Sequence, residues 1–294
     1  MARLGKVVVV GVGLIGGSFA LALKAAGQVD TVVGVDRSRD CLAAALQLGV
    51  IDRACSSWSE ALEAADLVML AVPVGQMRSV LAEMAQYLGA ATLISDAGST
   101  KQDVAAQAAL SLGAKVAQFV PGHPIAGAEK SGVGAASADL FRAKRVVLTP
   151  LAHNARAAVE RVAAAWQECG AEVSELTPLV HDQTFAAVSH LPHLLAYTLV
   201  HELAGRADSQ RLFSFAAGGF KDFTRIASSH PEMWRDICVA NRAPLIEEVD
   251  AYLAQLLRVR VLLASADAPA LHQLFAQARA ARDTWLEAQE PPGE

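Results

Sequence analysis

A histidine in the segment Gly122–Glu129 (G-H-P-I-A-G-A-E) has the surroundings of a functional side chain. The segment follows a predicted strand, and open α/β sheets bind their ligands at the carboxyl ends of their strands. We expect Pro124 and the flanking glycines to form an exposed turn from which His123 projects outward. Near neutral pH, a histidine there can accept the hydroxyl proton that an alcohol loses on oxidation by hydride transfer. The alternative is a solvated turn histidine without a chemical role.

Three glycines, Gly11, Gly13 and Gly16, form the pattern G-x-G-x-x-G directly between a predicted strand and a predicted helix. In that order they would permit a tight turn, a close approach of the backbone to a pyrophosphate, and close packing of the helix on the sheet. Asp36 ends the next predicted strand, where a carboxylate can bind both hydroxyls of a ribose. Its charge favours NAD over NADP, although the neighbouring Arg37 could pair with a 2′-phosphate. The alternative is a glycine-rich turn that binds no cofactor.

Ser99 and Lys101 lie in a second polar segment at a strand end, Asp96–Lys101 (D-A-G-S-T-K). We expect the Ser99 hydroxyl and the Lys101 ammonium near the nicotinamide and the substrate. In the alternative interpretation, Ser99 or Thr100 caps the next helix, and the local residues leave both open. The predicted cofactor contacts are Gly11, Gly13, Leu14, Ile15, Gly16, Asp36, Arg37, Val72, Pro73 and Lys101.

Two further segments place polar side chains on predicted helices. In Ser189–His193 (S-H-L-P-H), His190 and His193 share one helix face. No cysteine or carboxylate at metal-ligand spacing lies nearby in the sequence, so we expect no metal. Arg225 follows a glycine pair in G-G-F-K-D-F-T-R-I-A, and an arginine can bind a carboxylate through two hydrogen bonds. An ordinary surface salt bridge is the alternative for Arg225, and Trp234 is expected in the core.

These side chains must be positioned by the strands and helices that alternate through residues 1–178. Runs of β-branched residues predict strands that alternate with apolar-periodic helices, and this repetition is typical of a Rossmann-type, doubly wound parallel sheet. The predicted helices run from Leu14 to Ala26, from Gln76 to Leu88 and from Lys101 to Leu112. The predicted strands are Val7–Val10, Thr31–Val35, Leu67–Val72, Ala91–Ser95, Lys115–Val120, Arg145–Leu148 and Val173–Leu176.

Residues 179–288 show no further convincing strand and are predicted to form an all-helical domain. Its apolar-periodic stretches are Phe185–Ala204, Ala243–Leu263 and Leu271–Leu286. Helices with such broad apolar faces often bury them against a second copy, so we expect this domain to form a homodimer. Residues 289–294 are predicted to be a disordered tail.

The composition excludes several classes of protein. Hydrophobic types make up 53% of the 294 residues and charged types 19%, so the chain can form real cores and is not disordered. The 25 basic and 30 acidic residues include no basic run, so nucleic acid is not an expected partner. The cysteines form no C-x-x-C motif, which argues against a metal cluster or a disulfide scaffold and suits the reducing cytoplasm. They are Cys41, Cys55, Cys169 and Cys238.

The apolar stretch from Val7 to Leu23, preceded by Arg3 and Lys6, superficially resembles a signal peptide or a membrane span. Its length of about 17 residues is the minimum that crosses a bilayer. It also contains four glycines, each of which weakens a helix by about 1 kcal/mol. A strand, a glycine turn and a helix explain the stretch better, so we expect no membrane partner.

Taken together, six segments resemble the prephenate and arogenate dehydrogenase family of tyrosine biosynthesis. They occur in family order and cover nearly the whole chain; the first is generic to Rossmann folds, and the middle four together are highly specific. The segments are V-G-V-G-L-I-G-G-S at Val10–Ser18, D-A-G-S-T-K at Asp96–Lys101, G-H-P-I-A-G-A-E at Gly122–Glu129, S-H-L-P-H at Ser189–His193, G-G-F-K-D-F-T-R-I-A at Gly218–Ala227 and M-W-R-D-I at Met233–Ile237.

This resemblance implies the NAD-dependent oxidative decarboxylation of prephenate to 4-hydroxyphenylpyruvate. It matches His123 to the catalytic histidine that takes the ring-hydroxyl proton, and Ser99 to the serine that bonds the same hydroxyl. It matches Arg225 to the arginine that holds the ring carboxylate. Members of the family are typically dimers through the helical domain. The residues implied to line the substrate side chain and gate the pocket are His193, His190 and Glu129.

Other functions remain open at this point. Arogenate, or both substrates, is an alternative to prephenate, and we expect His193 and the loop around Glu129 to decide between them. A β-hydroxyacid dehydrogenase or an imine-type reductase would leave His123 and the segment Ser189–His193 unexplained. A dinucleotide-binding sensor without catalysis is the alternative from another class, but it does not need so many reactive polar groups at strand ends.

Overall fold

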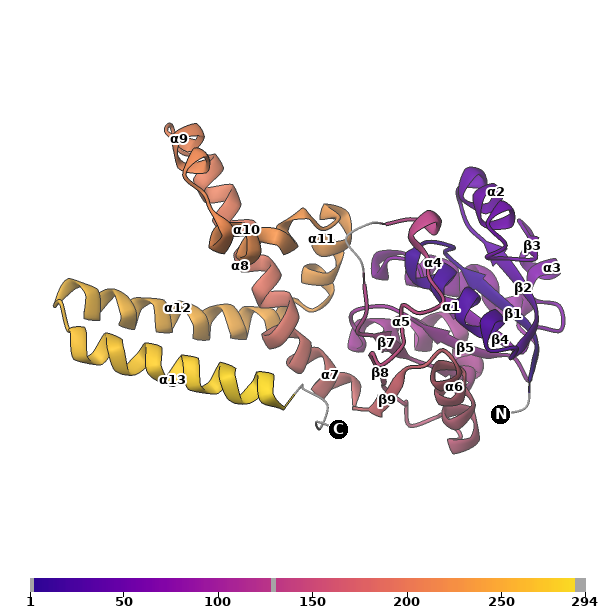
Figure 1. Ribbon diagram of the computed structural model, residues 1–294. Coiled ribbons are helices and arrows are strands. Elements are labelled where there is room, and N and C mark those ends of the chain that lie inside the picture. Colours follow the sequence, from indigo (N-terminus) through magenta and orange to yellow (C-terminus); the bar gives the residue numbers. More distant parts are fainter. Residues whose placement is uncertain (1–2, 128–130, 289–294) are drawn as a thin grey trace. The chain divides into compact units, whose positions relative to one another are not determined.

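A computed structural model describes residues 3–127 and 131–288 of the chain. The chain divides into two compact units, Met1–Pro244 and Leu245–Glu294. The predicted tail, residues 289–294, lies outside the described residues. The boundary expected near residue 178 falls inside the first unit, which holds both a sheet region and several helices (Figure 1).

A six-stranded parallel sheet with the order β3-β2-β1-β4-β5-β6 forms the centre of the first unit. The predicted doubly wound fold is therefore confirmed. Val7 and Val9 of β1 pack into one core cluster and Val8 and Val10 into another, so both faces of the strand are buried. The six strands are β1 (Leu4–Val10), β2 (Val29–Val35), β3 (Arg53–Ala54), β4 (Leu67–Leu70), β5 (Leu93–Asp96) and β6 (Phe119–Val120).

Helices supply the apolar side chains that complete these two clusters. Phe19 and Leu23 of α1 belong to the first cluster, together with Trp166 of α6, and Leu81 of α4 and Val104 of α5 belong to the second. The helices between the strands are α1 (Leu14–Ala25), α2 (Arg39–Gln47), α3 (Trp58–Leu62), α4 (Met77–Met84), α5 (Gln102–Leu112) and α6 (Arg156–Glu168). Short 3₁₀ turns are η1 (Val74–Gln76), η2 (Ala85–Tyr87), η3 (Gly113–Gln118) and η4 (Val133–Ala135).

A second sheet of three strands carries His123, which corrects the expectation of an exposed turn. In this sheet β7 (Gly122–Pro124) pairs antiparallel with β8 (Arg145–Leu148), and β8 pairs in parallel with β9 (Glu172–Glu175). His123 lies opposite Val147. Pairing with a strand about twenty residues away along the chain, invisible in the local pattern, turns this Pro- and Gly-rich segment into a strand.

The predicted strand Lys115–Val120 is also wrong over most of its length, because η3 extends to Gln118 and only Phe119–Val120 is extended. The ammonium of Lys115 donates to the carbonyls of Ala85 and Leu88 at 2.8 and 3.0 Å. These long-range bonds hold the turn against η2 and the residue that follows it, so tertiary contacts override the local β propensity.

Among the described residues after Pro178 there are only helices, as predicted. The stretch expected as one helix from Phe185 contains a π segment, η5, which ends two residues before Pro192. Because proline lacks an amide hydrogen, the regular α-helical bonding cannot run through this point. The elements are α7 (Pro178–Phe185), η5 (Ala186–His190), α8 (Leu191–Ala204), α9 (Ser209–Ser214), α10 (Gly218–Thr224), η6 (Arg225–Ser228), α11 (Pro231–Ala240), α12 (Arg242–Ala264) and α13 (Ala268–Glu287).

The second unit consists of most of α12 and the whole of α13. The carboxylate of Asp267 accepts a hydrogen bond from the backbone N–H of Ala270 at 3.0 Å and so caps α13. Large apolar side chains of these helices are exposed in the single chain. They include Tyr252, Leu253, Leu256, Leu257, Val261, Phe275 and Trp285. No helix within the described ranges is both long and apolar enough to cross a bilayer.

Candidate active site

The glycine turn between β1 and α1 leaves no room for a side chain at two of its three glycines. Gly11 has a φ of 88°, and a Cβ there would lie 2.6 Å from the carbonyl oxygen of Ala71. A Cβ on Gly16 would lie 2.2 Å from the carbonyl oxygen of Gly11, so α1 packs too closely for any side chain at this position. A Cβ on Gly13, in contrast, would meet no atom within 4 Å. The open space therefore begins at Gly13.

Gly13 is also the N-cap of α1, and it is the reason why this helix end can receive an anion. It has no side chain to bond the first amide groups, and the first turn of α1 contains no acidic residue. Free N–H groups and the positive end of the helix dipole favour a phosphate at such a site.

Asp36 lies beside this turn. Its Oδ2 accepts a hydrogen bond from the backbone N–H of Val12 at 2.9 Å, and its Oδ1 accepts one from the N–H of Ser38 at 2.9 Å. The two bonds fix the carboxylate at the end of β2 and leave each oxygen with further acceptor capacity. Arg37, the next residue, is exposed.

The other predicted cofactor contacts frame the same turn. Leu14 and Ile15 open α1, and both are partly buried. Val72 follows the end of β4, and its Cγ1 would lie 3.1 Å from a Cβ on Gly11. Pro73, next to it, is exposed.

Lys101 is fully buried, which differs from the expectation that its ammonium faces the cofactor. Its Nζ forms an ion pair with Asp96, equally buried, and donates to the carbonyl oxygen of Gly122 at 2.7 Å. Asp96 in turn accepts a bond from the N–H of Gly122 at 3.1 Å. The pair thus joins the end of β5 to the start of β7 and fixes the backbone directly before His123.

Ser99 is partly buried in the turn between β5 and α5, and neither Ser99 nor Thr100 caps the helix. The cap comes from a residue of α7 instead. The two carboxylate oxygens of Asp182 accept hydrogen bonds from the backbone N–H groups of Lys101 and Gln102, each at 2.8 Å. The alternative role that the sequence offered to Ser99 is therefore filled by a distant side chain.

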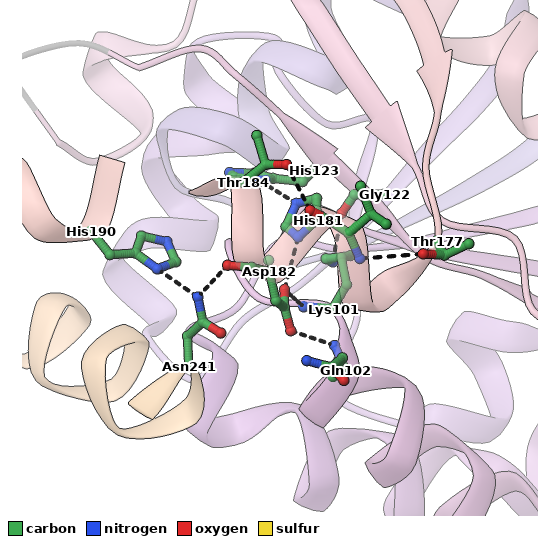
Figure 2. A network of polar contacts seen from close by, with 12 residues as sticks. Lys101, Gln102, Gly122, His123, Thr177, His181, Asp182, Thr184, His190 and Asn241 are labelled. Carbon is green, nitrogen blue, oxygen red and sulfur yellow. Dashed lines mark hydrogen bonds and ion pairs between the residues drawn. The ribbon is translucent and has the colours of Figure 1, made fainter. Parts of the chain in front are cut away.

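His123 lies at one end of a chain of three polar side chains, shown in Figure 2. Its Nδ1 is 2.9 Å from Nε2 of His181, and Nδ1 of His181 is 2.8 Å from Oδ1 of Asp182. Phe185, one turn further along α7, packs edge-on against the ring of His123, with 4.8 Å between the ring centroids. The imidazole of His123 is thus held by a hydrogen bond to His181 and by ring contact with Phe185, and these two side chains of α7 also contact each other.

Burial, reinforced by the neighbouring His181, Lys101 and His190, lowers the pKa of His123 well below its ordinary value of 6.5. Burial also lowers the pKa of His181. Removing a cation from water is costly, so both rings are neutral at neutral pH. A neutral imidazole has one free acceptor nitrogen, which is what a proton acceptor requires.

His190 and His193 lie in the predicted order but contact different partners. His190 is buried, and Nδ2 of Asn241 lies 2.9 Å from its Nδ1 and donates to the backbone carbonyl of Asp182 at 2.8 Å. His193 stacks on Trp234, with 3.6 Å between the ring centroids, and its Nδ1 bonds to the carbonyl of Ser189. Burial lowers the pKa of both histidines, that of His190 to about 4.

Arg225 begins η6 and is exposed. Its positive charge contributes to lowering the pKa of His193, after the larger effect of burial, so the two side chains lie within electrostatic reach of each other. Glu129, the remaining predicted substrate contact, lies outside the described residues.

Three residues of this network, His181, Asp182 and Asn241, escaped the sequence analysis. The available signal was the adjacent pair of polar residues His181-Asp182, one turn after the Thr177-Pro178 helix start. Asp182 gives no sign in the sequence that it caps a helix 80 residues away. Only the fold brings the pair beside His123.

Comparison with known proteins identifies close relatives over almost the whole chain. Family models described as the nucleotide-binding domain and the dimerization domain of prephenate dehydrogenase match residues 19–175 and 177–277. A prephenate dehydrogenase of Bacillus subtilis is 39% identical over 279 residues, which are 94% of this chain and 75% of that protein. A cyclohexadienyl dehydrogenase of Zymomonas mobilis is 36% identical and is aligned over 94% of both chains.

A crystal structure of prephenate dehydrogenase from A. aeolicus, in complex with hydroxyphenyl propionate and NAD+, has the same fold. It aligns with a TM-score of 0.90 at 34% sequence identity, over 95% of this chain and 98% of that one. The similarity in sequence and the similarity in fold thus point to the same group of proteins, and both extend over nearly the whole chain.

Proposed function

The chain belongs to the prephenate dehydrogenase family, and on that premise we propose that it oxidises and decarboxylates prephenate to 4-hydroxyphenylpyruvate with NAD+. The observation that carries this proposal is the neutral, partly buried His123 in β7, which closely follows β6, the last strand of the six-stranded parallel sheet. An alcohol can be oxidised there because its proton and its hydride have separate acceptors.

The residues around the glycine turn fit NAD. The open space at Gly13 and the uncapped start of α1 suit a pyrophosphate, and the fixed carboxylate of Asp36 suits the hydroxyls of a ribose. The carboxylate of Asp36 would repel the 2′-phosphate of NADP, which favours NAD. The exposed guanidinium of Arg37 is the group that could pair with that phosphate if NADP bound. When bound, NAD+ accepts the hydride that leaves C4 of the substrate ring.

His123 takes the proton of the ring hydroxyl while the hydride leaves the same carbon. Loss of carbon dioxide then returns two electrons to the ring, which becomes aromatic, and His123 gives the proton back to the phenolic oxygen. Ser99, beside the carboxyl end of β5, bonds the same hydroxyl and positions it for His123. These reaction steps require a proton acceptor that is neutral at the pH at which the enzyme works.

The cationic Arg225 holds the ring carboxylate, because a guanidinium binds a carboxylate through two parallel hydrogen bonds. His193, stacked on Trp234 within the field of Arg225, contacts the side chain of the substrate, together with His190 and Glu129. Leu14, Ile15, Val72 and Pro73 complete the cofactor contacts. Lys101 contributes by fixing the backbone before His123, since its own side chain is buried.

We further propose that residues 1–178 form the cofactor-binding domain and residues 179–288 the substrate and dimerisation domain. The exposed apolar side chains of α12 and α13 support a homodimer that buries them, because a monomer rarely exposes so many. The four cysteines are all free, which supports a cytoplasmic location.

The test is an assay of reduced-nicotinamide absorbance with prephenate and NAD+, beside parallel wells with NADP+ and with arogenate. Turnover with prephenate and NAD+ supports the proposal. Turnover with arogenate alone keeps the chemistry and changes the substrate, which is the alternative kept open by the cyclohexadienyl dehydrogenase relative. NAD+ binding without turnover in any well would contradict the proposal and favour a sensor.

A further inference from the structure

We propose that His181 and Asp182 are positioning residues that hold His123 in the one tautomer able to accept the substrate proton. This inference rests on the proposed function of His123 and adds two residues to it. The geometry consists of two successive hydrogen bonds, from His123 to His181 at 2.9 Å and from His181 to Asp182 at 2.8 Å (Figure 2).

The direction of each bond follows from what Asp182 can do. Its carboxylate is ionised: burial alone would raise its pKa, but hydrogen bonds from His181 and from the backbone N–H groups of Gln102 and Lys101 lower it. An ionised carboxylate only accepts, so Nδ1 of His181 must carry the hydrogen. A neutral His181 then has its lone pair on Nε2 and accepts the hydrogen of His123 Nδ1. The lone pair of His123 is left on Nε2, which is the atom available to the substrate hydroxyl.

Burial shields the hydrogen bond between His181 and Asp182 from water. The side chains of His181 and Asp182 are 0% and 1% exposed, so water does not compete for this bond. Among the described residues, the titratable groups that act on His123 are His181 from α7, Lys101 from the turn after β5 and His190 from η5, while Asp182, Lys101 and Asp96 act on His181.

Asp182 also connects these hydrogen-bonded side chains to the backbone at the start of α5. The same Oδ1 that faces His181 accepts the N–H of Lys101, and Oδ2 accepts the N–H of Gln102. Ser99 lies two residues before Lys101, in the turn that Asp182 anchors. One buried carboxylate therefore sets the tautomer of His123 and fixes the turn that carries Ser99.

His123 carries the substrate proton only temporarily during the reaction. When Nε2 of His123 takes the hydroxyl proton, the ring becomes a cation with hydrogens on both nitrogens. The hydrogen on Nδ1 of His123 is donated to His181, and the carboxylate of Asp182 lies on the far side of the His181 ring. The hydrogen bond and the negative charge together stabilise the His123 cation. The proton returns from Nε2 to the phenolic oxygen of the product.

A double-mutant cycle distinguishes this role from a purely structural one. His181→Phe keeps an aromatic ring against Phe185 and removes both nitrogens. We expect it to lower kcat by about 10- to 100-fold, within the range of proton-transfer catalysis, with KM for prephenate and NAD+ changed less than about threefold. In a His123→Asn background the same change should have almost no further effect, because its target is gone. Gln183→Ala, an exposed change on the same helix, is the matched control and should leave kcat unchanged.

Two results would overturn the inference. One is a folded His181→Phe enzyme with wild-type kcat, and the other is an equal loss of kcat in both backgrounds, which a structural defect would give. If His181→Phe does not fold, nitrogen NMR of the wild-type protein, labelled in its histidines, decides instead, with His181→Gln and His123→Asn used for assignment. The inference requires hydrogen on Nδ1 of both rings, and a hydrogen on Nε2 of His181 would refute it. Because this spectrum needs no turnover, it is independent of whether prephenate is the substrate.

Discussion

The carboxylate of Asp182 lies 2.8 Å from the backbone nitrogen of Lys101, a residue 81 positions earlier in the chain. This bond joins α7 to the start of α5 and thereby connects the helical region of the first unit with the segment that follows the carboxyl end of β5. The side chains assigned to proton transfer lie on both sides of it, with Ser99 in the turn before α5 and His123 against His181. Chemistry and folding therefore depend on the same buried carboxylate.

Replacement of His123 by asparagine is expected to remove proton transfer while leaving the cofactor site intact. Asparagine can still bond a hydroxyl but cannot take its proton, so kcat should fall by about 10²- to 10⁴-fold. Steady-state kinetics and NAD+ titration by fluorescence measure the two effects separately. A variant with wild-type kcat would show that another group accepts the proton.

The pH profile should reflect the lowered pKa of His123. Burial first, and the neighbouring His181, Lys101 and His190 next, lower this pKa well below 6.5, so the imidazole stays neutral as the pH falls through 6.5. Activity is present above the lowered pKa and is lost only when the pH falls through it. We expect kcat/KM to be flat from pH 7.5 down past 6.5, measured in buffers of constant ionic strength. An acidic limb at or above 6.5 in kcat/KM would contradict the assignment.

Two glycines of the turn should respond differently to the same substitution. A Cβ on Gly16 would lie 2.2 Å from a backbone oxygen, so Gly16→Ala must displace α1 and is expected to lower the melting temperature markedly. A Cβ on Gly13 would meet no protein atom, so Gly13→Ala should fold normally but raise KM for NAD+ by about tenfold, because the methyl group occupies the place of the pyrophosphate. Gly134→Ala, also without a contact within 4 Å, is the control for folding. Equal stability of the Gly13 and Gly16 variants would refute this account of the turn.

Much of the fold could be predicted from sequence because its signals are local. The valine run of β1, the glycine turn and Asp36 lie within one β-α-β unit, and their order alone indicates their arrangement. The exceptions are features that depend on distant partners. The strand at His123 forms because it pairs with the strand that contains Val147. The side chain of Lys101 is buried because it binds Asp96 and the carbonyl oxygen of Gly122. The residues around a lysine that follows a strand do not show whether its side chain is buried in an ion pair or contacts a cofactor.

The buried pair of Lys101 and Asp96 should be needed for stability rather than for cofactor affinity. Lys101→Met leaves the carboxylate of Asp96 buried without its counter-ion, which typically costs about 3–5 kcal/mol. Lys144→Met, at an exposed lysine, serves as the control and should change stability by less than about 0.5 kcal/mol. Urea unfolding of both variants measures the difference. A stable Lys101→Met protein with weakened NAD+ binding would instead restore the role that the sequence first indicated.

Transfer of the hydrogen at C4 of prephenate tests the central claim most directly. Prephenate carrying deuterium at C4 is incubated with NAD+ and the enzyme, and the reduced nicotinamide and the aromatic product are analysed by mass spectrometry. We predict one deuterium in the nicotinamide for each 4-hydroxyphenylpyruvate formed, at a rate that His123→Asn lowers by about 10²-fold or more. Reduced nicotinamide without deuterium, or no reduction although NAD+ binds, would contradict the proposed reaction.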